Sequence, residues 1–441
     1  MNIQAYLKEV ISHIRSKEAR RFVQLELEHH LQAVKEEGIR RGESVEKAEQ
    51  MAITQMGDSA QLGQKMNKLH KPKMDWLMFS GFVVLIVLSF LPLIYLQQTD
   101  FVMRKTVYSV IGFVLVFICM FFDYRKLIKY GYWFYGIGIV LLIILNMSPY
   151  IINGRPYLIL ASFTIEASST LPLFLLGWAS ILSHFKKSTL NKVIVEAPDS
   201  NKRSALNLSQ GWWKLALLYT LSVLLLFPSA NLFLILLYTA LVVVMVLFSP
   251  VMKRDKYIFS GGIGLLAVIG SVMAVFTKPY IFDRFRAFLQ PEEYATTYGY
   301  LIMKAKEYMG NAGWFGQALP KNGFEMAEAH TDFIFVTMTY GYGWLLAGIM
   351  VILLVGLSIR MILNFKTLQD SFGRMLTIGA VTLYTLSFSW SVLMSFGILP
   401  FVGVSLPFFS YGLMPTVLHS FLIGMVLSVY RRKDFVSFSM K

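Results

Sequence analysis

Runs of about 18–25 apolar residues recur along the chain, and they constrain its fold more than any other feature. Each run is long enough to cross a hydrocarbon core about 30 Å thick as a helix. Of the 441 residues, 56% are hydrophobic and 15% are charged, whereas soluble domains hold roughly 45–50% apolar residues. A single soluble core cannot bury that surplus. We therefore expect an all-α, polytopic membrane protein.

About ten membrane-spanning helices are predicted. Their expected positions are 76–96, 105–122, 130–148, 163–184, 211–228, 230–249, 257–277, 333–357, 375–398 and 411–430. The net charge of +15 comes from Lys and Arg in short patches between the runs. That distribution is a topology signal and not a nucleic-acid surface, so no nucleic-acid partner is expected. The positive-inside rule predicts a multi-pass protein of the cell membrane with both termini in the cytoplasm.

A small soluble unit precedes the membrane part, because the first residues combine charges of both signs with helical periodicity. Ser44 and Asp58 are placed to cap helix N-termini, with Gly42 and Gly57 as helix stops. The expected parts are a cytosolic helical bundle at 1–73, a ten-helix membrane domain at 74–433 and a cytosolic tail at 434–441. A flexible cytosolic linker is also predicted at 186–210.

One connection, 278–332, is much longer than the others and is expected to be a structureless loop outside the cell, since long translocated loops escape the charge rule. Loops of that length are usually functional. This one carries a set of charged and polar side chains: Arg284, Arg286, Glu325, Glu328, His330 and Asp332. It is therefore the best place in the sequence to look for chemistry.

Asp332 ends a polar string and directly precedes apolar Phe333, so its carboxylate lies at the water–hydrocarbon boundary. Its position alone leaves two interpretations open. As an N-cap it would accept hydrogen bonds from free backbone N–H groups of the next helix. As a catalytic base it would accept a proton from a substrate. Similarly, His330 can be an interfacial hydrogen-bonding residue, and the loop arginines can be solvated or can bind phosphate.

The sequence lacks the common motifs of nucleotide and metal chemistry. It contains no Walker loop, no Gly-x-Gly-x-x-Gly followed by an acidic residue, no metalloprotease helix and no Cys/His spacing typical of a metal site. Nucleotide-driven chemistry is therefore not expected.

Three stretches resemble the SEDS family of shape, elongation, division and sporulation proteins, the RodA/FtsW/SpoVE-like peptidoglycan glycosyltransferases. The family string P-E-x-H-T-D-F-I-F corresponds to Ala327–Phe335, and L-P-x-x-G-x-P-L-P-F-x-S-Y-G corresponds to Leu399–Gly412. The third stretch begins at Arg284 and includes Gly310, Gly313 and Gly316. A weaker match covers Asn153-Gly154. Residues 1–73 loosely resemble the helical prefix domains found ahead of some Gram-positive membrane proteins.

The chain also departs from the family pattern. Tyr340 and Gly341 replace two glutamates that usually follow the F-I-F string, and Glu166 begins the segment that reads Q-P-S-E in the family. The Gly-Gly-Ser-Ser that usually follows S-Y-G is Gly412–Pro415 here. The sequence is thus identified as a divergent member.

The resemblance implies an enzyme that polymerises lipid II into glycan strands at the outer face of the cytoplasmic membrane during cell elongation, division or sporulation. It implies Asp332 as the catalytic residue. Implied partners are lipid II, a class B penicillin-binding protein as transpeptidase, other cell-wall synthesis proteins and membrane lipids. No fixed cofactor is implied, and a divalent cation is left open. The expected substrate-binding residues are Arg284, Arg286, Glu328, His330, Thr331 and Ser410.

Two other classes of function remain open. Loss of several family charges also fits a non-catalytic scaffold or lipid-binding subunit, since charges inside membranes are usually functional. A transporter is less favoured, because no buried acidic residue paired with an inverted repeat is evident.

Overall fold

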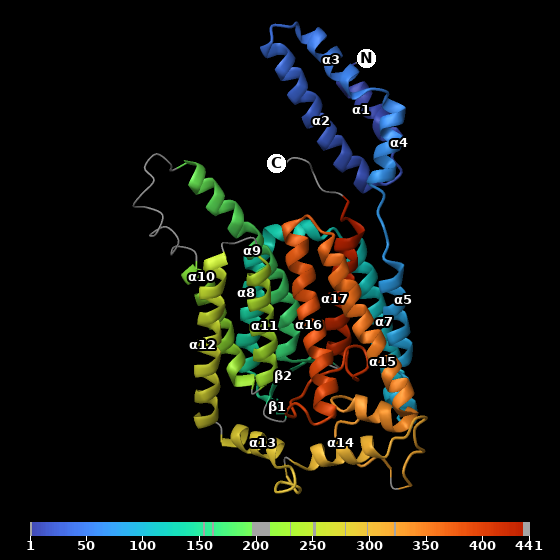
Figure 1. Ribbon diagram of the computed structural model, residues 1–441, viewed down its shortest axis with the longest axis vertical. Coiled ribbons are helices and arrows are strands. Elements are labelled where there is room, and N and C mark those ends of the chain that lie inside the picture. The colour runs from blue at the N-terminus through green and yellow to red at the C-terminus, as the bar shows by residue number, and fades with distance from the viewer. Residues whose placement is uncertain are drawn as a thin grey trace. The chain divides into compact units, whose positions relative to one another are not determined.

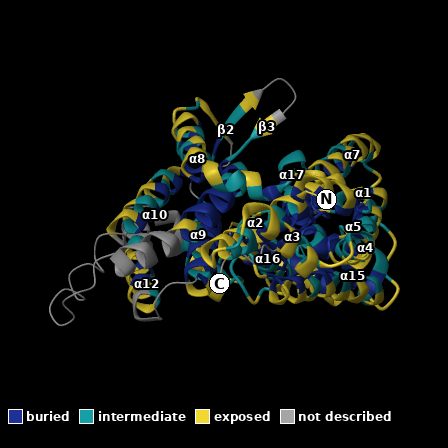
Figure 2. Cartoon of the chain, turned by 90° about the horizontal axis from the view of Figure 1, so that it is seen from above, coloured by how far each residue is buried: buried dark blue, intermediate teal, exposed yellow. Residues whose placement is uncertain are grey.

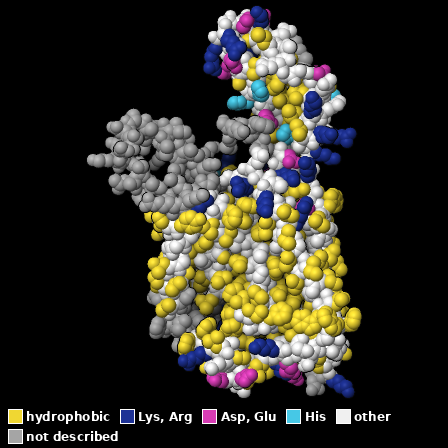
Figure 3. All heavy atoms as spheres, in the orientation of Figure 1, with side chains coloured by type: hydrophobic (Ala, Val, Ile, Leu, Met, Phe, Trp, Pro, Cys, Tyr) yellow, Lys and Arg dark blue, Asp and Glu magenta, His cyan; other side chains and the backbone are white. Residues whose placement is uncertain are grey.

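The structure, a computed structural model, describes residues 2–152, 155–160, 163–195, 212–229, 231–249, 253–277, 279–297, 299–321 and 323–434. Among these residues, six helices are long and apolar enough to cross a membrane, and three shorter helices are also apolar. Hydrophobic side chains cover the middle of the bundle face drawn in Figure 3, with charged side chains toward its ends. The predicted all-α, polytopic fold is confirmed.

The helices of the membrane part follow the apolar runs of the sequence (Figure 1). They are α5 (Trp76–Leu88), α6 (Leu91–Tyr95), α7 (Thr99–Phe121), α8 (Gly131–Asn146), α9 (Leu171–Val195), α10 (Trp212–Leu226), α11 (Leu232–Phe248), α12 (Lys253–Thr277), α15 (Ile334–Lys366), α16 (Ser371–Ser395) and α17 (Leu413–Arg431). The 3₁₀ turns between them are η1 (Tyr124–Tyr130), η2 (Ala167–Thr170) and η4 (Phe227–Ser229).

One predicted span is wrong at its start. Residues 163–170 are not part of a spanning helix, because they form strand β3 (Phe163–Ile165) and the turn η2. The helix α9 begins only at Leu171, next to Pro172, a residue tolerated in the first turn of a helix. The predicted linker 186–210 also begins too early, since α9 continues to Val195. Residues 196–211 lie outside the described part.

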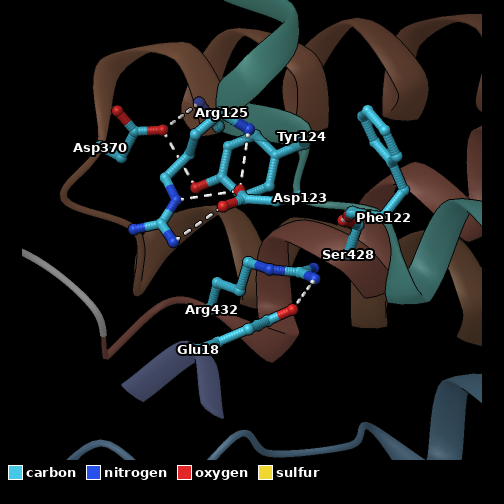
Figure 4. Close-up of polar contacts among 9 residues, drawn as sticks. Glu18, Phe122, Asp123, Tyr124, Arg125, Asp370, Ser428 and Arg432 are labelled. Carbon is cyan, nitrogen blue, oxygen red and sulfur yellow. Dashed lines mark hydrogen bonds and ion pairs between the residues drawn. The ribbon is translucent and has the colours of Figure 1, made fainter. Parts of the chain in front are cut away.

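The interior of the bundle is built around α16, whose buried residues lie on all sides of the helix. It packs against α9, α11 and α15, whereas exposed side chains gather on peripheral helices such as α7 and α12 (Figure 2). Helices α8 and α9 approach so closely at Gly131 that a Cβ there would overlap the side chain of Ser180. At one end of the bundle the Tyr124 hydroxyl donates to the Asp370 carboxylate at 3.1 Å, and Asp370 caps α16 (Figure 4).

The other end of the bundle, here called the hairpin end, carries a small antiparallel sheet and two short helices (Figure 1). Strand β2 (Arg155–Leu160) pairs with β1 (Tyr150–Ile152) and with β3. The long connection is not structureless as predicted, because it contains α13 (Pro279–Leu289) and α14 (Tyr300–Gly310). Both short helices have polar residues at every turn, which explains why hydropathy alone did not find them.

The chain divides into two compact units, and the smaller comprises Met1–Asp75 together with Val429–Lys441. Its helices are α1 (Ile3–Ser12), α2 (Lys17–Arg40), α3 (Val45–Met56) and α4 (Ser59–Leu69), packed on a core that includes Leu27 and Leu31. The predicted caps are confirmed, because the side chains of Ser44 and Asp58 accept hydrogen bonds at the starts of α3 and α4. Within this unit, Arg432 is buried and pairs with Glu18 at 2.9 Å (Figure 4).

Candidate active site

A tight turn carries the candidate acid into α15. Glu328 has a φ of 57°, in the left-handed region, and its carbonyl oxygen accepts hydrogen bonds from the N–H groups of Thr331 and Phe333, both at 3.1 Å. The Thr331 hydroxyl donates to the Glu328 carboxylate. The Thr337 hydroxyl, one turn into α15, donates to the carbonyl of Ala329 at 2.7 Å. These bonds fix the backbone on both sides of Asp332.

Asp332 is not the N-cap of the helix that follows it. The N-cap of α15 is Phe333, and no side chain caps this end. The reason is that the turn closes on the Glu328 carbonyl, so the backbone passes Asp332 before the helix begins. The capping interpretation of Asp332 was therefore wrong.

The environment of Asp332 favours its protonated form. The residue is half-buried, and burial of its carboxyl raises its pKa to about 7. The positive charge of Arg155 opposes this rise, while the carboxylates of Glu328 and Glu166 add to it. A carboxyl with a pKa near the ambient pH can both take up and release a proton during a reaction. Asp332 is thus suited to general acid–base work.

Arg155 was missed by the sequence reasoning. It lies on β2, and its guanidinium occupies the space beside Gly403, where a Cβ would overlap it. Its charge stabilises the Asp332 carboxylate. Burial raises the pKa of Tyr157, and the charge of Arg155 partly opposes that rise. The available signal was an arginine directly after Asn153-Gly154, a weak match whose two residues lie outside the described part.

Glu166 also belongs to this cluster of charges. It was noted only as a departure from the family pattern, yet it lies near enough to act on Asp332. The hydroxyl of Ser168 donates to its carboxylate at 2.6 Å. The segment between β3 and α9 therefore faces the same site as the turn before α15.

Ser410 joins the two most specific motifs of the sequence. Its hydroxyl donates to the carbonyl oxygen of Thr331 at 2.7 Å and accepts a hydrogen bond from the N–H of Leu406 at 2.7 Å. The N–H of Tyr411 donates to the His330 carbonyl at 2.9 Å. The segment before α17 is thus attached to the two residues that precede Asp332.

His330 is held among aromatic rings. Its imidazole lies 4.9 Å from the ring of Phe101 and 5.8 Å from that of Tyr411. Burial lowers the pKa of His330, and the nearby Glu328 carboxylate only partly offsets this. The imidazole is therefore neutral near pH 7, so it can donate one hydrogen bond and accept another.

The predicted arginines of the long connection lie on α13. Arg284 and Arg286 are both exposed, and the guanidinium of Arg286 lies 4.3 Å from the ring centre of Phe282. Among the described residues, neither is one of the charged groups that act on Asp332. The structure therefore brings together Glu328, His330, Thr331, Asp332 and Ser410, whereas the two arginines lie on a separate short helix.

The positions where glutamates are replaced are filled by an aromatic cluster. Tyr340 packs against Tyr308 at 4.9 Å, Phe324 at 5.8 Å and Tyr95 at 6.5 Å between ring centres. A Cβ at Gly341 would lie 2.7 Å from the Tyr95 ring. Tyr340 and Gly341 therefore fit one aromatic cluster, which occupies the space that two glutamate side chains would need.

No metal-binding cluster is evident in the part of the chain that the structure describes, where no three His, Cys, Asp or Glu side chains gather to hold an ion. The carboxylates near Asp332 are accompanied by the cationic Arg155, which lowers their attraction for a metal. The described residues therefore offer no group of ligands for the divalent cation that the resemblance left open.

Fold and site together define a polytopic membrane protein that holds an acid of near-neutral pKa beside an arginine at one end of its helix bundle. The chain belongs to the FtsW/RodA/SpoVE family of cell cycle proteins, whose sequence pattern matches residues 69–434.

Relatives and solved structures agree with this assignment. A probable peptidoglycan glycosyltransferase FtsW of Geobacter sp. (strain M18) is 35% identical over 44% of this chain and 53% of its own length. Another, from Trichlorobacter lovleyi, is 27% identical over 75% of this chain and 83% of its own. A chain from a structure titled as a peptidoglycan synthase complex that coordinates polymerization and crosslinking superposes with a TM-score of 0.65, at 21% identity, over 82% of this chain and 98% of that chain. This last likeness concerns the fold.

Proposed function

We propose that this protein is a peptidoglycan glycosyltransferase that polymerises lipid II into glycan strands at the outer face of the cytoplasmic membrane. The observation that carries the proposal is the half-buried carboxyl of Asp332, with a pKa of about 7, on which the positive charge of Arg155 acts. The names of the relatives support the same activity.

The proposed step is a glycosyl transfer. A sugar hydroxyl of the acceptor attacks the anomeric carbon of the donor, a new C–O bond forms, and the bond from that carbon to the lipid pyrophosphate breaks. The hydroxyl proton passes to the Asp332 carboxylate, and the pyrophosphate leaves with the electron pair of the broken bond. General-base help of this kind contributes about 10²–10⁴-fold to the rate.

We assign stabilisation of the departing pyrophosphate to Arg155, because a guanidinium binds phosphate oxygens in pairs and the charge of Arg155 already acts on the Asp332 carboxyl. Arg284 and Arg286 are further donors from α13. Glu328 and His330 are proposed to bind sugar hydroxyls, whereas Thr331 and Ser410 support the turn. The energy of the reaction comes from the activated lipid substrate, so no nucleotide is needed.

The hairpin end is proposed to face the outside, with both termini in the cytoplasm, because Lys and Arg concentrate in the connections of the opposite end. The proposed partner is a class B penicillin-binding protein, which would crosslink the new strands. The synthase complex that this fold resembles couples polymerization to crosslinking.

The test is lipid II polymerisation by purified protein in liposomes, with and without a candidate transpeptidase. Asp332→Asn keeps the size of the side chain but cannot accept the proton, so we expect activity to fall by about 10²–10⁴-fold while the membrane level of the protein is unchanged. The matched control is Glu292→Gln, an exposed carboxyl at the same end, which should behave as wild type.

Retained polymerisation in Asp332→Asn would exclude Asp332 as the base. A wild-type protein that is inactive with every transpeptidase tested, yet binds one of them, would favour the scaffold alternative.

A further inference from the structure

Lys105 is an ionisable residue buried inside the helix bundle. It lies in α7, and its residue has no exposed surface. Its amine donates to three successive carbonyl oxygens, those of Phe408, Phe409 and Ser410, at 2.5, 3.4 and 3.1 Å. The three N–H donors of a lysine thus match three acceptors. A charge placed at this depth is costly and marks a functional position by default.

The backbone that Lys105 contacts is in an unfavourable conformation. Phe408 has a φ of 67°, which a bulky side chain rarely adopts, and its ring is packed between Phe82 and His419. This conformation turns consecutive carbonyl groups toward one point. Carbonyl dipoles arranged in this way repel each other unless a cation lies between them. Lys105 supplies that cation.

The same backbone continues directly to the residues that hold the catalytic turn. Ser410 donates to the Thr331 carbonyl at 2.7 Å, and the Tyr411 N–H donates to the His330 carbonyl at 2.9 Å. Thr331 is the residue before Asp332. A continuous set of hydrogen bonds therefore leads from the Lys105 amine to the backbone next to the carboxyl.

We propose that Lys105 is a positioning residue, which holds the segment Phe408–Tyr411 in the conformation that fixes the turn bearing Asp332. It acts through the backbone and does not touch the reacting atoms. Its effect on the reaction rests on the proposed function, whereas its effect on the segment does not.

The structural test is hydrogen–deuterium exchange of the protein in nanodiscs. Lys105→Met keeps a long side chain and removes every donor. We expect the amides of Leu406 and Tyr411 to exchange about tenfold faster or more, the factor for losing one hydrogen bond from a charged donor. Lys126→Met, the same change at an exposed lysine, is the matched control and should leave both amides as in wild type.

The kinetic test separates positioning from simple packing. We expect Lys105→Met to lower kcat about tenfold or more with little change in KM, and to move the acidic limb of the pH–rate profile to lower pH, because a loosened segment exposes the Asp332 carboxyl to water. Lys105→Gln, which retains two N–H donors, should recover part of both effects. This variant also serves for the exchange measurement if Lys105→Met does not insert.

A double-mutant cycle adds an independent check. The rise in activation free energy in the Ser410→Ala/Lys105→Met double variant should be smaller than the sum of the rises in the two single variants, because both residues act through one segment.

Unchanged exchange at Leu406 and Tyr411 in a correctly inserted Lys105 variant would overturn the inference. Faster exchange in a protein whose wild type does not polymerise lipid II would support the role of Lys105 in holding the segment and would overturn the proposed function.

Discussion

Asp332 owes its near-neutral pKa to two opposed effects, burial that raises it and Arg155 that lowers it. A general base works only when deprotonated, so polymerisation should rise with pH through about 7 and level off above it. Arg155→Gln removes the group that favours the carboxylate, and the acidic limb should then move to higher pH. The check is a pH–rate profile between about pH 5 and pH 9. The exposed Lys321→Gln should leave the limb in place, and an unmoved limb in Arg155→Gln would contradict the assigned pairing.

At the same scale, the sequence predicted roles for Asp332, His330 and Ser410, because each belongs to a specific string, and the structure places these three residues in one hydrogen-bonded region. The sequence gives no sign of the role proposed for Lys105, because a charge at the start of an apolar run usually signals topology. Arg155 and Glu166 were not recognised as part of the site for a different reason. Their proximity to Asp332 depends on the fold of the β1–β3 segment, and such short pairings leave little periodicity in a sequence.

The helix α15 contains a built-in break that only glycine permits. Gly343 has a φ of 86°, and a Cβ there would overlap the carbonyl of Trp314. We expect Gly343→Ala to lower the melting temperature measurably, because this backbone conformation alone costs an alanine about 1–3 kcal/mol. The control is Gly348→Ala in the same helix, where no atom lies within 4 Å of the added Cβ. Equal melting temperatures of the two variants in detergent would argue against a required break.

Elements with long apolar runs were predictable because their length matches the membrane. The elements of the hairpin end were not, since α13 and α14 are short and mix charges with aromatic residues. The loop after α14 that pairs with α15 next to the break at Gly343 illustrates the limit. The N–H groups of Trp344 and Leu345 donate to the carbonyls of Gly313 and Trp314, a pairing that depends on three-dimensional closeness alone.

For the whole molecule, we expect removal of residues 1–70 to preserve polymerisation in vitro. The family match begins at residue 69, and the residues that act on Asp332 all belong to the unit Trp76–Ser428. The measurement compares rates per inserted molecule for the full and shortened chains, together with localisation in cells. Loss of activity in a shortened chain that inserts normally would show that the small unit belongs to the catalytic machinery.

Topology gives a second prediction at this scale. A cysteine at the exposed Gln317 should react with an impermeant thiol reagent added from outside, and one at Asn201, beyond the described residues, should not. Background labelling is low, because the natural thiol of Cys119 is buried. Labelling of Asn201→Cys from outside would reverse the orientation.

The hydrogen bond between Ser410 and Thr331 has a consequence for the synthesis of the protein on the ribosome. The two residues are 79 positions apart, and the helices α15 and α16 are made between them. At roughly 5–20 residues per second, the ribosome needs about 4–16 s to cover that distance. Throughout this interval the turn bearing Asp332 exists without the hydrogen bond from Ser410. The hydrogen-bonded conformation of this turn therefore forms late in translation, and we expect a chain that ends before Ser410 to have no polymerase activity.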